Sequence, residues 1–160
     1  MTVEKTFVMI KPDGVKRAII GELVSRFERV GLKLIGMKMV HIDKDFAKAH
    51  YSDLVDKPFF SGLQDMIVSG PVVAMVWEGA KAISLVRKMV GATEPAQALP
   101  GTIRGDYAHI TYARADANGG AMPNLVHASD SEKTADKEIH LWFSDSEMFD
   151  KYETVLSKLM

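Results

Sequence analysis

The chain has 160 residues, of which 47% are hydrophobic and 26% charged, and its formal net charge at pH 7 is -1. This balance is typical of one globular domain, here residues 1–160, and gives no electrostatic basis for binding nucleic acid or an anionic membrane. The chain contains no cysteine, which excludes disulfides and thiolate metal sites. The apolar runs are too short to span a bilayer and the first residues lack a signal-peptide layout, so we expect a cytoplasmic protein without membrane partners.

The spacing of apolar residues predicts alternating strands and helices along most of the chain. Leu23, Phe27 and Val30 recur every three or four residues, which places them on one face of an amphipathic helix. Short β-rich apolar runs between turn residues indicate strands. The expected strands are 6–10, 32–42, 72–77 and 125–127, and 106–112 is also β-like. The expected helices are 15–30, 44–54, 59–68, 80–90, 132–143 and 147–159.

The order of these elements fits an α+β sandwich in which helices cover one sheet. The helix expected at 147–159 would turn a set of apolar side chains inward, namely Phe149, Tyr152, Val155, Leu156 and Leu159. Lys11 follows the first strand, at the end where open α/β sheets commonly bind ligands. It is therefore a candidate to neutralise a phosphate or to bond a sugar hydroxyl, and a lone solvated lysine is the alternative.

Two connections stand out. Residues 92–105 form a long, turn-rich segment with Pro95 and Pro100, and such loops are usually functional or disordered. Residues 113–123 are small, polar and glycine-rich, and Asn118-Gly119 is a turn signal. Because β-compatible residues flank that turn, we expect 113–123 to form a hairpin-like or looped excursion with its tip in solvent.

One short stretch, Asn124–Ser131, carries the chemistry. An apolar run ends in His127, and residues that cap helix N-termini follow at once. Ser129 has Glu132 three residues later, which is the spacing of a capping box. A histidine before a helix N-terminus can meet an anion, and its neutral imidazole is well populated at neutral pH. A partly buried histidine satisfied by the backbone explains the stretch alone equally well.

The stretch resembles the active-site segment of nucleoside diphosphate kinases, Asn-x-x-His-(Gly/Ala)-Ser-Asp. Further blocks match this family in the same order along nearly the whole chain: Val8–Val15, His50–Leu54, Lys57–Phe60, Ser69–Gly79, Pro100–Asp106 and Lys137–Phe143. The chain resembles an archaeal-type member, with extra residues between Arg104 and Asn124. The resemblance implies a ferredoxin-like βαββαβ core with an antiparallel four-stranded sheet covered by helices.

The resemblance also implies a reaction and its catalytic residues. The terminal phosphate of a nucleoside triphosphate would pass to a nucleoside diphosphate by a ping-pong mechanism, through a phosphohistidine on His127. Glu138 would hold the imidazole through Nε2, and Ser129 would hydrogen-bond Glu138. Lys11 and Tyr51 would complete the catalytic set, with Tyr51 near the transferred phosphate.

The nucleotide would occupy further residues by the same resemblance. Lys11 and Asn124 would bind the ribose hydroxyls, and Phe59 would stack on the base, which predicts broad base specificity because every base has a π-face. A Mg²⁺ ion would bridge the phosphates, with Asp130 reaching it through water. The phosphates of the leaving nucleotide would be bound by Arg87, Thr93 and Arg104. The residue that faces the base opposite Phe59 stays unassigned.

Each residue taken singly has a plainer explanation. Phe59 could pack in a core or an interface, Glu138 could be a solvated helix residue, and Arg87 and Arg104 could pair with surface carboxylates. The remaining histidines have no matching role, and we interpret them as structural or surface residues: His41, His50, His109 and His140.

Two other functions compete with the enzyme. A binding module that has lost catalysis would lack His127, Lys11 or Asn124, and all three are present. A nucleic-acid-binding role finds no basic run to support it. Because the family forms oligomers, and 92–105 resembles the loop that meets around the threefold axis of its hexamers, we expect a homohexamer.

Overall fold

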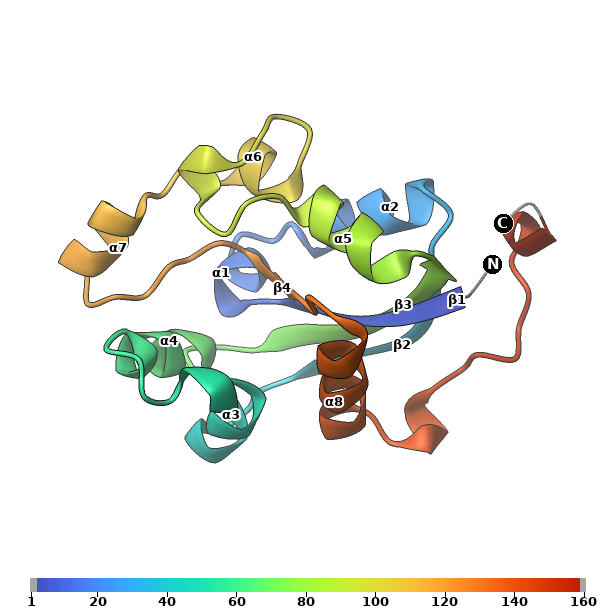
Figure 1. Ribbon diagram of the computed structural model, residues 1–160, viewed down its shortest axis with the longest axis horizontal. Coiled ribbons are helices and arrows are strands. Elements are labelled where there is room, and N and C mark those ends of the chain that lie inside the picture. The colour runs from blue at the N-terminus through green and yellow to red at the C-terminus, as the bar shows by residue number, and fades with distance from the viewer. Residues whose placement is uncertain (1–2, 159–160) are drawn as a thin grey trace.

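The computed structural model describes residues 3–158 and is organised around an antiparallel β-sheet with helices on both faces (Figure 1). The strand order is β2-β3-β1-β4. The strands are β1 (Val3–Ile10), β2 (Lys33–Val40), β3 (Val72–Ala80) and β4 (Val126–Ala128). All neighbouring pairs are antiparallel, which confirms the predicted ferredoxin-like α+β fold.

The helices divide between the two faces of the sheet. In Figure 1, α2, α5 and α6 lie above it, and α3, α4 and α8 lie below it. Within residues 3–158, no helix has both the length and the apolar character to cross a membrane. The helices are α1 (Pro12–Lys16), α2 (Ile20–Arg29), α3 (Lys44–His50), α4 (Phe60–Ile67), α5 (Ala82–Val90), α6 (Ile103–Tyr107), α7 (Tyr112–Ala117) and α8 (Glu132–Trp142). Single 3-10 turns occur at η1 (Ser52–Leu54), η2 (Pro95–Gln97), η3 (Asp145–Glu147) and η4 (Val155–Lys158).

β1 shows how one strand supplies both hydrophobic cores. Successive side chains of a strand point to opposite faces, so Val8 and Ile10 join the core beneath α2 and α5. Phe7 and Met9 join the core beneath α3, α4 and α8. Because both faces are covered, all four side chains are fully buried. β1 is a central strand, so Lys11, which follows its C-terminal end, lies at the middle of the sheet.

The helix predicted at 15–30 is divided in two. Pro12 occupies the start of α1, where a proline has no amide hydrogen bond to lose. The chain then bends at Ala18, which has a left-handed φ of 56°, and helix resumes at Ile20. The apolar spacing belongs to α2, where Leu23 and Phe27 are buried.

The β structure expected at 106–112 is wrong, because α6 includes Asp106 and Tyr107 and α7 begins at Tyr112. The hairpin expected at 113–123 is also wrong, because α7 occupies its first half. Thr111 caps this helix by accepting a hydrogen bond from the amide of Arg114. Gly119 and Gly120, both with positive φ, lead the chain out of the helix. A helix end favours left-handed backbone as strongly as a hairpin turn does, and the glycine signal therefore suited both structures.

The helix expected at 147–159 is also wrong. From Met148 until the turn η4 the segment has no regular secondary structure and bends at Lys151. Its backbone forms a hydrogen bond to the edge strand of the sheet. The amide of Phe149 donates to the carbonyl of Ile35 at 2.7 Å, where β2 bulges between Leu34 and Gly36. Phe149 and Val155 are exposed rather than inward. The expected contact of Leu159 lies outside the described residues.

Candidate active site

His127 lies in β4, directly opposite Met9 of β1. The strand is preceded by Leu125, whose φ of 71° is rare for a residue with a branched side chain. Leu125 is held from both sides, because its amide donates to Asp13 Oδ2 at 2.9 Å and its carbonyl accepts from the amide of Lys11 at 2.8 Å. Lys11 and the first turn of α1 thus hold the strand that presents the histidine, and this role of Asp13 was not foreseen.

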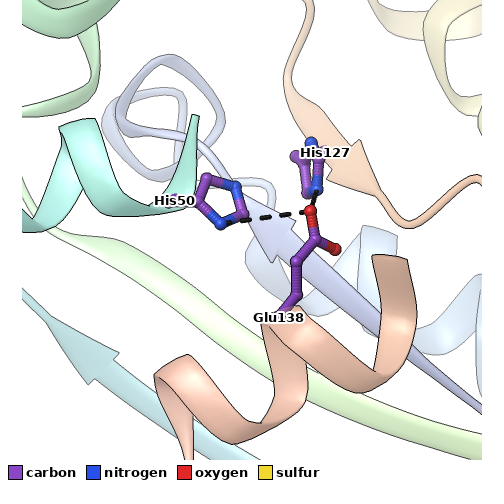
Figure 2. A group of neighbouring side chains, drawn as sticks. All are labelled: His50, His127 and Glu138. Atoms are coloured by element: carbon purple, nitrogen blue, oxygen red, sulfur yellow. Dashed lines mark hydrogen bonds and ion pairs between the residues drawn. The ribbon is translucent and has the colours of Figure 1, made fainter. Parts of the chain in front are cut away.

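The side chain of His127 is oriented by a buried carboxylate. Its Nε2 lies 2.7 Å from Glu138 Oε1 in α8, and Ser129 Oγ donates to the other oxygen of Glu138 at 2.5 Å. A carboxylate accepts hydrogen bonds, so Nε2 carries the proton and Nδ1 keeps its lone pair. Figure 2 shows Nδ1 on the side of the ring away from Glu138.

Ser129 is therefore not the helix cap that its spacing suggested. Its hydroxyl is occupied with Glu138, and Ser131 instead caps α8 by accepting from the amide of Thr134. Because Ser129 is fully buried and bonded to Glu138, it cannot cap the helix. The cap is supplied by Ser131, two residues later at the exposed start of α8.

The imidazole of His127 is neutral at physiological pH. Burial is the largest cause, followed by the positive charges of Lys11 and Arg104, and together these lower its pKa to about 3. A neutral imidazole with a free Nδ1 lone pair is the nucleophilic form. Burial also raises the pKa of Glu138 above its usual range.

His50 lies beside this pair, which the sequence interpretation missed. Its ring is perpendicular to that of His127, with centroids 4.6 Å apart, and Nδ1 accepts a hydrogen bond from the indole N–H of Trp142 at 3.0 Å. Because indole only donates, Nδ1 is unprotonated, and burial holds the pKa of His50 well below its usual range. Its place next to Tyr51 in the chain was the available signal.

Figure 2 shows His50, His127 and Glu138 converging from α3, β4 and α8. Their donor atoms lie within 4.8 Å of one another, as in a metal site. His127 Nε2 bonds Glu138, and His50 Nδ1, which lies 4.0 Å from Glu138 Oε1, accepts from Trp142. His50 Nε2 is buried without a hydrogen-bond partner in the described part of the chain. The group is best explained as a support that orients His127.

Lys11 and Asn124 meet in front of the histidine. Lys11 Nζ donates to Asn124 Oδ1 at 2.7 Å, and Asn124 Nδ2 donates to the carbonyl of Thr93 at 2.8 Å. Burial, followed by the charge of Arg104, lowers the pKa of Lys11 to about 8. The three residues join β1, β4 and the 92–105 segment in one chain of hydrogen bonds.

Arg87 and Arg104 place two guanidinium groups near each other. Arg104 is buried and donates to the carbonyls of Asn124, Gly91 and Val126 at 3.1, 3.0 and 2.6 Å. It thereby holds the entry and first residue of β4, a structural task that the sequence interpretation did not include. Burial and the charge of Arg87 lower its pKa to about 10, so it stays charged at neutral pH.

A cleft of about 410 Å³ brings the predicted residues together. All residues predicted to bind nucleotide or metal line it, as do the catalytic residues except Ser129 and Glu138, which support His127 from beneath. Phe59 is partly exposed, whereas Tyr51 is buried, which raises its pKa. A larger hollow of about 1010 Å³ borders α8 and the C-terminal segment and contains none of these residues.

Asp130 is the cleft residue best suited to a cation. Its side chain is exposed beside His127, and hydrogen bonds from Thr134 and Ser131 keep its pKa below the usual range. One ionised carboxylate suits an ion that retains waters and takes its other ligands from phosphates.

Residues 4–148 match the family model described as "Nucleoside diphosphate kinase". "Nucleoside diphosphate kinase 1" of Glycine max is 55% identical over 142 residues, which cover 89% of each chain.

Solved structures agree with the sequence matches. One is a transition-state mimic of the nucleoside-diphosphate kinase from Borrelia burgdorferi with bound vanadate and ADP (TM-score 0.92, 42% identity, 96% of this chain and 94% of that one). Another is a halophilic nucleoside diphosphate kinase from Halobacterium salinarum in complex with CDP (TM-score 0.88, 47% identity, 99% and 98%).

Proposed function

The chain belongs to the nucleoside diphosphate kinase family and transfers phosphate between nucleotides, and from this premise we propose that Nδ1 of His127 carries the phosphoryl group. The observation behind this proposal is the hydrogen bond from Nε2 to Glu138, which leaves Nδ1 unprotonated. Three cationic side chains, Lys11, Arg87 and Arg104, line the same cleft and would neutralise phosphate charge.

The reaction has two displacements. The Nδ1 lone pair attacks the γ-phosphorus of a nucleoside triphosphate, the bond to the β–γ bridging oxygen breaks, and that oxygen leaves with the nucleoside diphosphate. The imidazole gains positive charge, which the Glu138 carboxylate stabilises through Nε2–H, with Ser129 holding its second oxygen. A terminal oxygen of a second diphosphate then attacks the phosphorus, and the P–N bond breaks to return neutral His127.

We assign the nucleotide contacts by the positions of the cleft residues. Lys11 and Asn124, already hydrogen-bonded to each other, would bind the ribose hydroxyls. Arg87, Thr93 and Arg104 would bind the phosphates; three of the five N–H donors of Arg104 are used on carbonyls, which leaves two for phosphate oxygens.

The remaining assignments concern the two ends of the nucleotide. Tyr51 lies beside the His127 ring, with centroids 5.8 Å apart, and would approach the transferred phosphate. Phe59 would stack on the base, so donors should differ by less than about a hundredfold, or about 2.8 kcal/mol. Turnover with ATP, GTP, CTP and UTP tests this expectation.

We propose that a divalent cation, Mg²⁺, accompanies the phosphates. Asp130 would hold it through water, and the ion would supply charge neutralisation on the phosphate oxygens. Asp130→Ala should raise the Mg²⁺ concentration needed for half-maximal activity. An unchanged Mg²⁺ dependence would contradict the assignment.

We propose a homohexamer that works in the cytoplasm. The 92–105 segment supports the hexamer, since Arg26 bonds both Gly101 and Asp106 and holds a loop from which Leu99 protrudes with 74% of its surface exposed. Leu99→Glu should release smaller species in light scattering. A dimer or monomer of the unaltered protein would overturn the hexamer, and cell fractionation tests the location.

The phosphohistidine is tested with ATP labelled on its γ-phosphate and no acceptor. The protein should take up a phosphate that is labile in acid and stable in base. His127→Ala should abolish uptake, whereas His140→Ala, on the exposed face of α8, should retain it. Retained uptake in His127→Ala would overturn the proposal.

A further inference from the structure

The cleft has a wall that the family resemblance did not supply. Tyr112, Ala115, Asp116, Gly120 and Met122, all from the segment 112–122, line it together with Phe59. In Figure 1, α7 and α4 lie at the same end of the molecule, and residues of both helices line the cleft. Since Phe59 is where the base would stack, the segment 112–122 borders the base end of the site.

This wall is attached on two sides. Toward α4, the backbone of Gly119 and Gly120 lies against Gly62 and Phe59, so closely that a Cβ on Gly62 would come within 2.2 Å of the Gly119 carbonyl oxygen. On the other side, Glu94 Oε1 accepts from the Tyr112 amide at 2.8 Å. The segment 112–122 is therefore held in place on both sides as part of the cleft lining.

Asp116 is the acidic residue of this wall. Its carboxylate is exposed, and no hydrogen bond or ion pair of that side chain is found within residues 3–158. The other carboxylate lining the cleft, Asp130, lies in the segment directly after His127. An ionised carboxylate only accepts hydrogen bonds and repels phosphate, so a suitable partner is an N–H edge of the base.

We propose that Asp116 accepts hydrogen bonds from the base and makes the enzyme favour guanine over uracil. Guanine presents an imino N–H beside an amino group, which two carboxylate oxygens can engage together, whereas uracil presents one N–H between two carbonyl oxygens. The proposal rests on the proposed function for the place of the base. A partly exposed hydrogen bond of this kind should favour guanine by about three- to tenfold, within the broad specificity expected from stacking.

The test measures the dissociation constants of GDP and UDP by calorimetry, together with kcat/KM for both acceptors. Asp116→Ala should lower the GDP-to-UDP preference toward one, and Asp116→Asn, whose amide both donates and accepts, should lower it by improving UDP. The matched control is Asp45→Ala, an exposed aspartate in the first turn of α3, which should keep the preference.

The outcomes separate the explanations. An unchanged preference in Asp116→Ala would overturn the proposal, as would an equal gain in affinity for both nucleotides, which indicates only relief of repulsion from the phosphates. Because calorimetry needs no turnover, a protein that binds with this preference but takes up no phosphate on His127 would contradict the proposed catalytic step and leave the base contact standing.

Discussion

Glu138 Oε1 lies 2.7 Å from Nε2 of His127, and the two residues reach each other from α8 and β4 across the end of the sheet. The contact fixes the imidazole tautomer, and the burial of Glu138 limits the water that would otherwise compete for its carboxylate. Charge that develops on the imidazole during transfer therefore meets a carboxylate that is already in place.

Glu138→Gln should slow phosphorylation of His127 by about ten- to a hundredfold, because a hydrogen bond to a charged group contributes about 1.5–3 kcal/mol. The amide keeps an acceptor for Nε2–H but has no charge to stabilise the imidazolium. Rapid-quench labelling measures the rate. Glu132→Gln, an exposed change in the first turn of the same helix, should leave the rate unchanged, and equal effects would contradict the role of Glu138.

The lowered pKa of Lys11 predicts that catalytic activity depends on pH. Its pKa is lowered from 10.5 to about 8, so the ammonium is charged below pH 8 and neutral above it. We expect kcat/KM, which reports the free enzyme, to fall above pH 8. In Lys11→Arg the guanidinium stays charged, and the fall should move to higher pH. Identical profiles for the two proteins would exclude Lys11 as the titrating group.

The lowered pKa of Lys11 has the opposite effect on stability: above pH 8 the free energy of unfolding should rise while kcat/KM falls. The unfolded lysine keeps its proton to about pH 10.5, so between pH 8 and 10.5 the unfolded state binds more protons than the folded state. This group should therefore increase the free energy of unfolding as the pH rises through that window. Urea titrations of wild type and Lys11→Met should differ in this slope.

Gly62→Ala should destabilise the protein by about 1–3 kcal/mol through overpacking, because the new methyl group meets the Gly119 carbonyl. Moving 119–120 away from α4 should also weaken nucleotide binding. The control is Gly21→Ala in α2, where a Cβ has open space and the higher helix propensity of alanine should stabilise by up to about 1 kcal/mol. Thermal unfolding compares them, and equal effects would show that the contact is unimportant.

Arg104→Lys should cost about 1–3 kcal/mol of stability, because one ammonium cannot reach the three carbonyls that the planar guanidinium bonds. Arg87→Lys removes one long contact, 3.4 Å to the Ala128 carbonyl, and should change stability by less than about 0.5 kcal/mol. Chemical denaturation distinguishes the two. Similar losses would mean that Arg104 does not hold β4.

Many of the helices and strands can be predicted from the sequence, because the signals that specify them are local. The apolar periodicity of α2 and the buried run of β3 leave few alternatives to a helix and a strand. The reaction and the ferredoxin-like core were not encoded in these local signals, and both were implied by the resemblance of several blocks, in order along the chain, to one family.

Tertiary structure decided the conformation of segments and the position of side chains that depend on a partner far away in the sequence. Residues 148–154 are not helical, although their apolar spacing suggested a helix, and the amide of Phe149 bonds the edge carbonyl of Ile35. The segment 112–117 is helical with Glu94 holding its first amide, although its glycines suited a hairpin. His50 reaches His127 only because α3 packs on the sheet beside α8. In each case the deciding hydrogen bond or packing face comes from a remote part of the chain, which local sequence cannot encode.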